Sequence, residues 1–144
     1  MINKPHKIMD EITRDGQIGE YFVKANYLAQ GFNTSTPSID TYYDLIVDTG
    51  DELLKTQIKS ISPQNGYITV PLVNRKNSSV EKNGRGKTHY YVELVDIISV
   101  YNKSTRDIYH IPTSELPLDK TSVRFKTDGI RGRSNAPSIE QYKS

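Results

Sequence analysis

Cysteine is absent from this chain of 144 residues, so neither a disulfide bond nor a thiolate metal site is available to it. Long apolar runs are also lacking, and the sequence therefore predicts neither a membrane-spanning helix nor a secretory signal peptide. These absences favour a soluble, intracellular protein in the cytoplasm, with no membrane partner. The length is that of one ordinary domain, so we expect residues 1–144 to form a single domain with a sizeable core.

The net charge of the whole chain is only +2, but two segments of it are strongly positive. Between residues 71 and 89, five Lys and Arg residues stand against one acid; between residues 120 and 144, six stand against two. Each segment is therefore net +4, and the remainder of the chain is net −6. Positive charge gathered in a loop and a tail suits a polyanionic partner.

One helix is predicted from about residue 16 to residue 30. Its apolar stripe recurs at steps of four, three and four residues, which is the helical period. Gly31 follows in the position where helices commonly end in a left-handed residue. The stripe consists of Ile18, Phe22, Ala25 and Ala29, and Glu20, Val23 and Tyr27 form a second row.

Several strands are predicted after the helix. Residues 43–47 and 53–61 flank the turn "DTGDE" and read as a hairpin, and "GYITVPLV" follows as another strand. The segments "IISVYN" and "DIYHIP" read as a last hairpin, and "SVRFKT" as a short edge strand. This order indicates an α/β or α+β domain with a mixed central sheet.

Four polar residues on these elements could together hydrolyse a phosphodiester bond. Such hydrolysis needs a metal held by oxygen ligands, and Mg²⁺ typically takes one or two carboxylates and keeps several waters. Asp44 and Glu20 offer carboxylates, while Gln57 and Lys59 share one face of the second strand because strand side chains alternate. A lysine there can stabilise developing charge or orient the attacking water. Each residue alone is typical of a solvated surface, so the prediction depends on the set.

The segments "GQIGEYFVKANYLAQGF" and "YYDLIVDTGDELLKTQIKS" resemble the PD-(D/E)xK nuclease superfamily. The spacing is most similar to that of the small endonucleases encoded in group I introns and of the archaeal Holliday junction resolvases. In both, a helix carries a glutamate, a hairpin carries an aspartate and the next strand carries a lysine. Glu20, Asp44 and Lys59 stand in those places, and "ISVYNKSTRDIYHIPTSEL" is similar to the closing hairpin of the intron-type group. The likeness spans about residues 16–116, and only the ordered set is specific.

The resemblance implies a restriction-endonuclease-like α/β core, in which helices flank a mixed central β-sheet. It implies an endonuclease that uses Mg²⁺, with Mn²⁺ as a substitute, to cut double-stranded DNA, leaving 5′-phosphate and 3′-hydroxyl ends. Glu20, Asp44, Gln57 and the backbone carbonyl of Ile58 would then bind the metal, and Lys59 would stabilise charge or orient water. Cations of the basic loop at about 74–89 and of the basic tail at about 120–144 would contact DNA: Arg75, Lys76, Arg85, Lys87, Arg131 and Arg133.

Three functions remain open within this interpretation. A site-specific homing endonuclease comes first, because the long basic loop suits groove reading in duplex DNA. A Holliday junction resolvase comes second, because its helix and hairpin match nearly as well. The third is a DNA-binding protein without catalysis, since Gln57 stands where the superfamily usually has Asp or Glu and offers only a neutral oxygen. Intron-type members often have glutamine there, which fits that branch.

One subunit of 16.4 kDa carries one set of candidate residues and hence makes one cut in one strand. Breaking both strands needs two sites, so we expect a homo-oligomer with twofold symmetry, either a dimer or a tetramer. The segments "IISVY" and "DIYHI" are expected to be apolar edge strands and to form the interface.

Overall fold

The computed structural model describes residues 10–74, 89–127 and 135–144. No helix in this described part of the chain combines the length and apolarity needed to cross a membrane. Its elements, in order, are α1 (Glu11–Ala29), β1 (Asn33–Ser35), β2 (Leu45–Asp48), β3 (Leu53–Ile61), β4 (Tyr67–Pro71), β5 (Val73–Asn74), β6 (His89–Tyr90), α2 (Tyr91–Leu94), β7 (Ile97–Asn102), β8 (Ile108–Pro112), η1 (Thr113–Glu115), β9 (Ser122–Lys126) and η2 (Ile139–Tyr142).

The central sheet has five strands in the order β1-β2-β3-β7-β8. Its pairs are antiparallel except for β3 and β7, which run parallel, so the sheet is mixed as predicted. Two further pairs, β4–β9 and β5–β6, form separate two-stranded sheets. The prediction of an α/β fold with a mixed central sheet is confirmed, and the predicted bounds of β3 are those observed.

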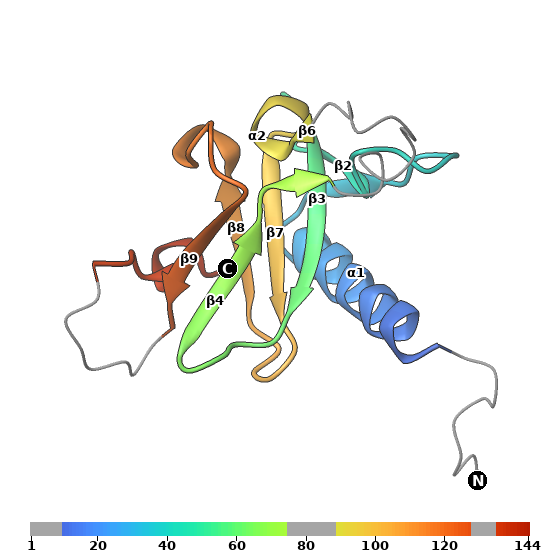
Figure 1. The fold of residues 1–144 in the computed structure, drawn as a ribbon. Coiled ribbons are helices and arrows are strands. Elements are labelled where there is room, and N and C mark those ends of the chain that lie inside the picture. Colours follow the sequence, from blue (N-terminus) through green and yellow to red (C-terminus); the bar gives the residue numbers. More distant parts are fainter. Residues whose placement is uncertain (1–9, 75–88, 128–134) are drawn as a thin grey trace, which may run out of the picture.

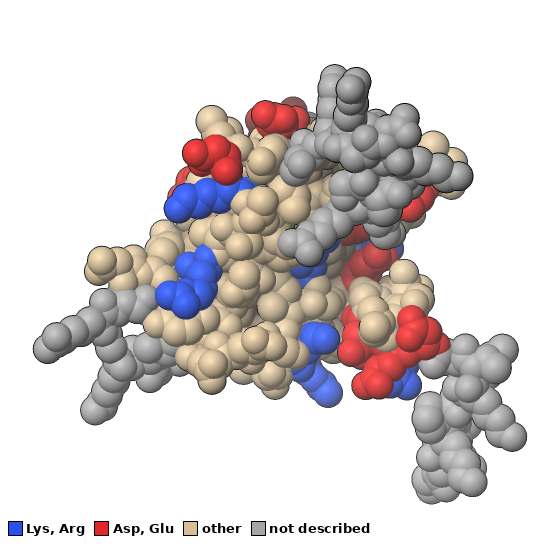
Figure 2. All heavy atoms as spheres, in the orientation of Figure 1, with Lys and Arg blue, Asp and Glu red and all other residues tan. Residues whose placement is uncertain are grey.

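The sheet lies between α1 on one face and the β4–β9 ribbon on the other (Figure 1). The strand predicted from "GYITVPLV" breaks into β4 and β5, and "SVRFKT" supplies β9 as the partner of β4. One core cluster fills the α1 side and a larger one fills the β4–β9 side. In the same orientation, Asp and Glu gather over α1 and the upper rim, whereas Lys and Arg lie over the ribbon face (Figure 2).

Helix α1 differs from its prediction at its start and in its buried face. It begins at Glu11, because the side chain of Asp10 caps it by accepting hydrogen bonds from the backbone of Ile12 and Thr13. The predicted apolar stripe is wrong: Ile18 and Phe22 are 39% and 38% exposed. The row that contacts the sheet is instead Gly19, Val23 and Tyr27.

Gly19 explains why that row faces the sheet. A Cβ added to Gly19 would collide with Ser60 Oγ and lie 3.3 Å from Tyr101 Cδ1. The missing side chain therefore lets α1 approach β3 and β7 closely. Because Glu20 is the next residue, this contact also fixes where Glu20 stands relative to β3.

The strands expected at the subunit interface are covered within the chain. β7 is not an edge strand, since it lies between β3 and β8. β8 is an edge of the sheet, but the C-terminus lies along it: Tyr109 bridges to Lys143, and the Ser144 N–H donates to the Ile108 carbonyl at 2.9 Å. The prediction of an edge strand is therefore wrong for "IISVY" and confirmed for "DIYHI", whose edge the C-terminus partly covers. Their place in a subunit interface stays a prediction.

A hydrogen-bond chain that runs from the interior to the surface joins the sheet to α1 and to the C-terminus. His110 stacks on Tyr27, with ring centroids 4.2 Å apart, and its Nε2 lies 2.7 Å from Asn26 Oδ1, which also accepts from Ser144 Oγ. Because Oδ1 can only accept, Nε2 carries the proton and Nδ1 accepts from Ser99 Oγ at 2.8 Å. Burial lowers the pKa of His110 to about 4.

We predict that the protein loses stability in mild acid through His110. The pKa of its imidazole falls from 6.5 in the unfolded chain to about 4 in the fold, so the unfolded chain binds a proton first. The contribution is complete above pH 6.5 and disappears as the pH falls towards 4, up to about 3 kcal/mol. Urea unfolding of the wild type and His110→Gln across this range measures the difference. A difference that stays constant with pH would contradict the prediction.

We also predict that Gly19→Ala lowers the free energy of unfolding by about 1–3 kcal/mol, because the added Cβ overpacks the α1–β3 contact. Gly16→Ala is the matched control: no atom lies within 4 Å of its Cβ, so it should gain up to about 1 kcal/mol of helix propensity. Urea denaturation measures both. Adding Ser60→Gly to Gly19→Ala should restore stability, and a double variant no better than Gly19→Ala would place the strain elsewhere.

Candidate active site

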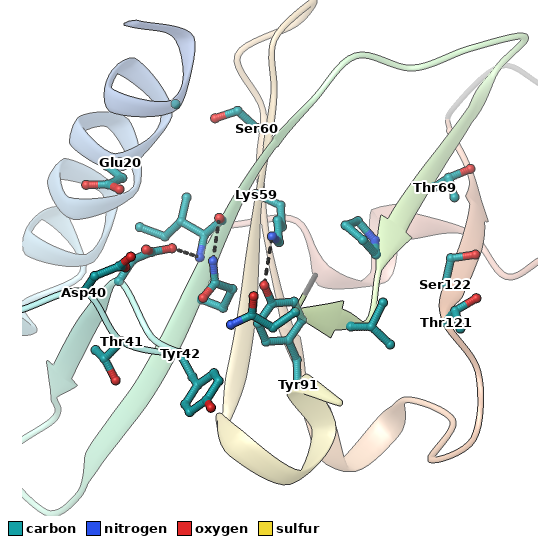
Figure 3. Close-up of a pocket in the computed structure, with 17 residues that line it drawn as sticks. Glu20, Asp40, Thr41, Tyr42, Lys59, Ser60, Thr69, Tyr91, Thr121 and Ser122 are labelled. Atoms are coloured by element: carbon teal, nitrogen blue, oxygen red, sulfur yellow. Dashed lines mark hydrogen bonds between the residues drawn. The ribbon is translucent and has the colours of Figure 1, made fainter. Parts of the chain in front are cut away.

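A cleft of about 910 Å³ opens beside the stretch of β3 that extends past β2. Its walls come from α1, the segment before β2, β3, β4, α2 and the residues around the start of β9. Figure 3 shows Glu20 on one side of it and Thr69, Thr121 and Ser122 on the other. The cleft is lined by all the residues predicted to act in catalysis or metal binding, which are Glu20, Asp44, Gln57, Ile58 and Lys59.

The backbone of β3 changes partner at this cleft. Its register with β2 ends at the pair Leu45–Thr56, and the N–H of Asp44 donates to the Thr56 carbonyl at 2.8 Å. One step further, the N–H of Ile58 donates to Asp44 Oδ2, also at 2.8 Å (Figure 3). The carbonyl of Ile58 lies on the same side of the strand as its N–H. Asp44 therefore continues the ladder with its side chain and stands beside the Ile58 carbonyl.

Gln57 and Lys59 lie on the face of β3 opposite to α1, as the alternation of the strand predicts. The Gln57 side-chain Nε2 is 3.4 Å from the Ile58 carbonyl oxygen. Lys59 Nζ donates to the Tyr91 hydroxyl at 3.1 Å and lies 4.9 Å from the centroid of the Tyr91 ring. Tyr91 is buried at the start of α2, so its hydroxyl group holds the Lys59 ammonium group in a fixed place.

Glu20 reaches the cleft from the third turn of α1. Burial raises the pKa of its carboxyl group, the negative charge of Asp44 raises it further, and Lys24 opposes both effects. Two carboxylates that repel one another across a partly buried cleft favour a cation between them. The structure thus brings together Glu20 and Asp44, which lie 24 residues apart in the sequence.

The donor set fits a hard divalent cation such as Mg²⁺. It consists of the Glu20 and Asp44 carboxylates, the Ile58 carbonyl and the amide of Gln57, all of which offer oxygen. Among the described residues, no three His, Cys, Asp or Glu side chains are placed to hold a metal ion together, so neutral oxygens would have to complete the set. Gln57 would need to turn its amide so that Oε1, rather than Nε2, faces the Ile58 carbonyl.

Asp40 and Tyr91 line the cleft but were not among the predicted site residues. Asp40 is a third acid lining the cleft; the sequence shows it as an ambiguous acid near the site, and the predicted set leaves it out. Tyr91 is separated from Lys59 by 32 residues, and one tyrosine among ten gives no signal of this contact. The cations predicted to contact DNA lie outside the described residues: Arg75, Lys76, Arg85, Lys87, Arg131 and Arg133.

The sequence profile of the PD-(D/E)XK endonuclease family matches residues 11–144. The chain belongs to this family. The superfamily predicted from the helix, the hairpin and the lysine-bearing strand is therefore confirmed, and with it the prediction of an endonuclease.

Among solved structures, this PD-(D/E)XK endonuclease is similar to a bacterial homing endonuclease, I-Ssp6803I. The TM-score is 0.65 and the sequence identity is 22%, over 94% of this chain and 88% of that chain. At this identity the likeness concerns the fold alone. A search of curated protein sequences finds no match.

We predict that Glu20→Gln stabilises the metal-free protein near neutral pH. The pKa of Glu20 lies above 4.5 in the fold, so its charged form is disfavoured there, and the penalty grows as the pH rises through that raised pKa. Urea unfolding in EDTA at pH 4 and pH 7.5 should show a gain only at the higher pH. Mg²⁺ should then stabilise the wild type more than the variant.

The matched control is Glu11→Gln, which removes an exposed glutamate from the first turn of the same helix. It should lose about 0.3–1 kcal/mol, because an acid at a helix N-terminus is favourable. If Glu20→Gln behaves like Glu11→Gln at both pH values, the repulsion between Glu20 and Asp44 has no effect on stability.

Proposed function

We propose that this chain is a metal-dependent endonuclease that hydrolyses phosphodiester bonds in double-stranded DNA. The observation that carries the proposal is the convergence of Glu20, Asp44 and Lys59 from α1 and the β2–β3 hairpin on one cleft. A carboxyl group whose pKa is perturbed by burial and by a second carboxylate, beside a lysine in a cleft, is typical of a catalytic site. Membership of an endonuclease family supports the same reaction.

In the proposed site, Asp44, Gln57 and Lys59 carry the three positions that give the family its name. Asp44 and Glu20 would bind the metal, with the Ile58 carbonyl and Gln57 Oε1 as further ligands. A bound Mg²⁺ or Mn²⁺ would supply Lewis acidity and a more acidic water. Lys59 would stabilise the negative charge that develops on the phosphate, and the products would be 5′-phosphate and 3′-hydroxyl ends.

Tyr91 would act as a positioning residue for Lys59. Its buried hydroxyl accepts from Lys59 Nζ at 3.1 Å, and so limits the rotamers that the long lysine side chain can adopt. Because the Lys59 side chain is already held in one place, it loses less conformational entropy when a phosphate binds.

A site-specific homing endonuclease is the substrate class that we favour. The support is the solved structure titled as a bacterial homing endonuclease, which matches most of this chain and is itself mostly covered by it. A single cleft with one set of candidate residues cuts one strand, so double-strand cleavage requires a twofold homo-oligomer, a dimer or a tetramer. A four-way junction serves as the competing substrate in the test below.

The test is cleavage of plasmid DNA and of a synthetic four-way junction with Mg²⁺, Mn²⁺ or EDTA. Asp44→Ala and Lys59→Ala should each reduce the rate by at least about 100-fold, because each removes a group that acts on charge in the transition state. Lys55→Ala is the matched control for Lys59→Ala: it lies on the same face of β3, outside the cleft, and should cut at the wild-type rate.

Circular dichroism must first show that each variant is folded. Cleavage by folded Asp44→Ala at the wild-type rate would contradict the proposed assignment of the active site. A wild type that binds duplex DNA but cuts neither substrate with either metal would instead support the inactive scaffold. Cutting of the junction in preference to duplex DNA would support a resolvase, and light scattering of the active species gives the number of subunits.

A further inference from the structure

The β4–β9 ribbon has an inner and an outer face of different chemistry. Alternate residues of both strands, among them Ile68, Val70 and Phe125, are buried against the central sheet. The register then places the remaining side chains in pairs on the other face. These outer pairs are Tyr67–Lys126, Thr69–Arg124 and Pro71–Ser122.

The outer face is polar and carries positive charge without negative charge. Neither β4 nor β9 contains an Asp or Glu, whereas the chain outside the two basic segments is strongly acidic. Arg124 is exposed, makes no ion pair among the described residues and lies with its guanidinium 4.2 Å from the centroid of the Tyr67 ring. Stacking on the ring holds the planar group in place and leaves its N–H donors available.

This face runs directly into the cleft. Thr69 and Pro71 on β4, and Thr121 and Ser122 around the start of β9, line the same cleft as Glu20 and Lys59. In Figure 3 the side chains of Thr69, Thr121 and Ser122 stand on the wall opposite Glu20. A polymer whose phosphate is bound at Lys59 and which continues across the cleft therefore passes over the ribbon.

We propose that the outer face of β4–β9 enters the major groove of duplex DNA beside the cut site, with Arg124 contacting a guanine edge. The inference rests on the proposed endonuclease function and adds the element that reads the sequence. The major groove admits a two-stranded β-ribbon. Arginine pairs with the O6 and N7 of guanine through two hydrogen bonds, threonine and serine hydroxyls pair with either kind of base, and Lys126 reaches a phosphate.

The experiment selects bound sequences from a pool of fully randomised duplexes in EDTA, which keeps metal-dependent cleavage from contributing. The wild type should enrich a sequence containing guanine at a fixed position. Arg124→Ala should lose the preference at that position, keep its neighbours, and bind the wild-type sequence about 10- to 100-fold more weakly. Arg124→Lys keeps the positive charge but lacks the two parallel N–H donors of the guanidinium group. It should therefore bind more tightly than Arg124→Ala without recovering the guanine preference.

Lys103→Ala is the charge-matched control. It removes an exposed cation of the β7–β8 connection that pairs with Asp15 at 3.6 Å, and should leave both the selected sequence and the affinity unchanged. Thr69→Ala leaves the Arg124–Tyr67 stack in place and gives a second test if Arg124→Ala fails to melt cooperatively. It should change the preference at one position near that of Arg124, because the two residues are register partners.

The ribbon proposal is overturned if Arg124→Ala and Thr69→Ala enrich the wild-type sequence, or if the wild type enriches none. These outcomes are independent of the nuclease assignment, which is measured by plasmid cleavage with Mg²⁺ or Mn²⁺. If the wild type cuts DNA and the ribbon variants keep the wild-type sequence preference, the ribbon proposal is refuted and the endonuclease proposal stands. If the wild type selects a sequence, the ribbon variants lose that preference and the wild type cuts no DNA, the ribbon proposal stands and the endonuclease proposal is refuted.

Discussion

The hydrogen bond from the Ile58 N–H to Asp44 Oδ2, 2.8 Å long, is the constraint on which the rest of the site depends. β3 extends beyond the end of β2, and a strand that has no neighbour on one side exposes unpaired backbone groups there. Asp44 satisfies one of them with a charged oxygen, which makes a stronger bond than a neutral acceptor does. The same step turns the Ile58 carbonyl towards the cleft. A single carboxylate thus ends the β2–β3 pairing and begins the site.

The second wall of the site depends on an absent side chain. Gly19 lets α1 lie against Ser60 and Tyr101, and the next residue, Glu20, is carried into the cleft with it. Packing has to hold the helix there, because the carboxylates of Glu20 and Asp44 repel one another. Val23 and Tyr27 provide that packing in the core cluster on the α1 side of the sheet. The site is therefore held in a less favourable electrostatic state by a well-packed interface.

The parts of the fold that depend on local pattern were predictable, and the parts that depend on tertiary contact were not. β3 has its predicted bounds and its predicted faces, because the neighbouring turn residues mark its start and a two-residue period assigns its faces. The apolar stripe with Ile18 and Phe22 was misread: periodicity identifies two candidate faces on α1, and only the close approach at Gly19 chooses between them. Tyr91 and the pairing of β4 with β9 have no local signal at all.

The neutral side chain of Gln57 is consistent with this electrostatic balance. Burial and Asp44 already raise the pKa of Glu20, and a carboxylate at position 57 would add a fourth acid to a cleft that Glu20, Asp40 and Asp44 already line. In the proposed site an amide would contribute an oxygen ligand without that repulsion, while leaving fewer charges to attract a cation. The glutamine would therefore lower cation affinity and raise the stability of the metal-free fold. On this argument the departure from the family's usual acid follows from where Gly19 has placed Glu20.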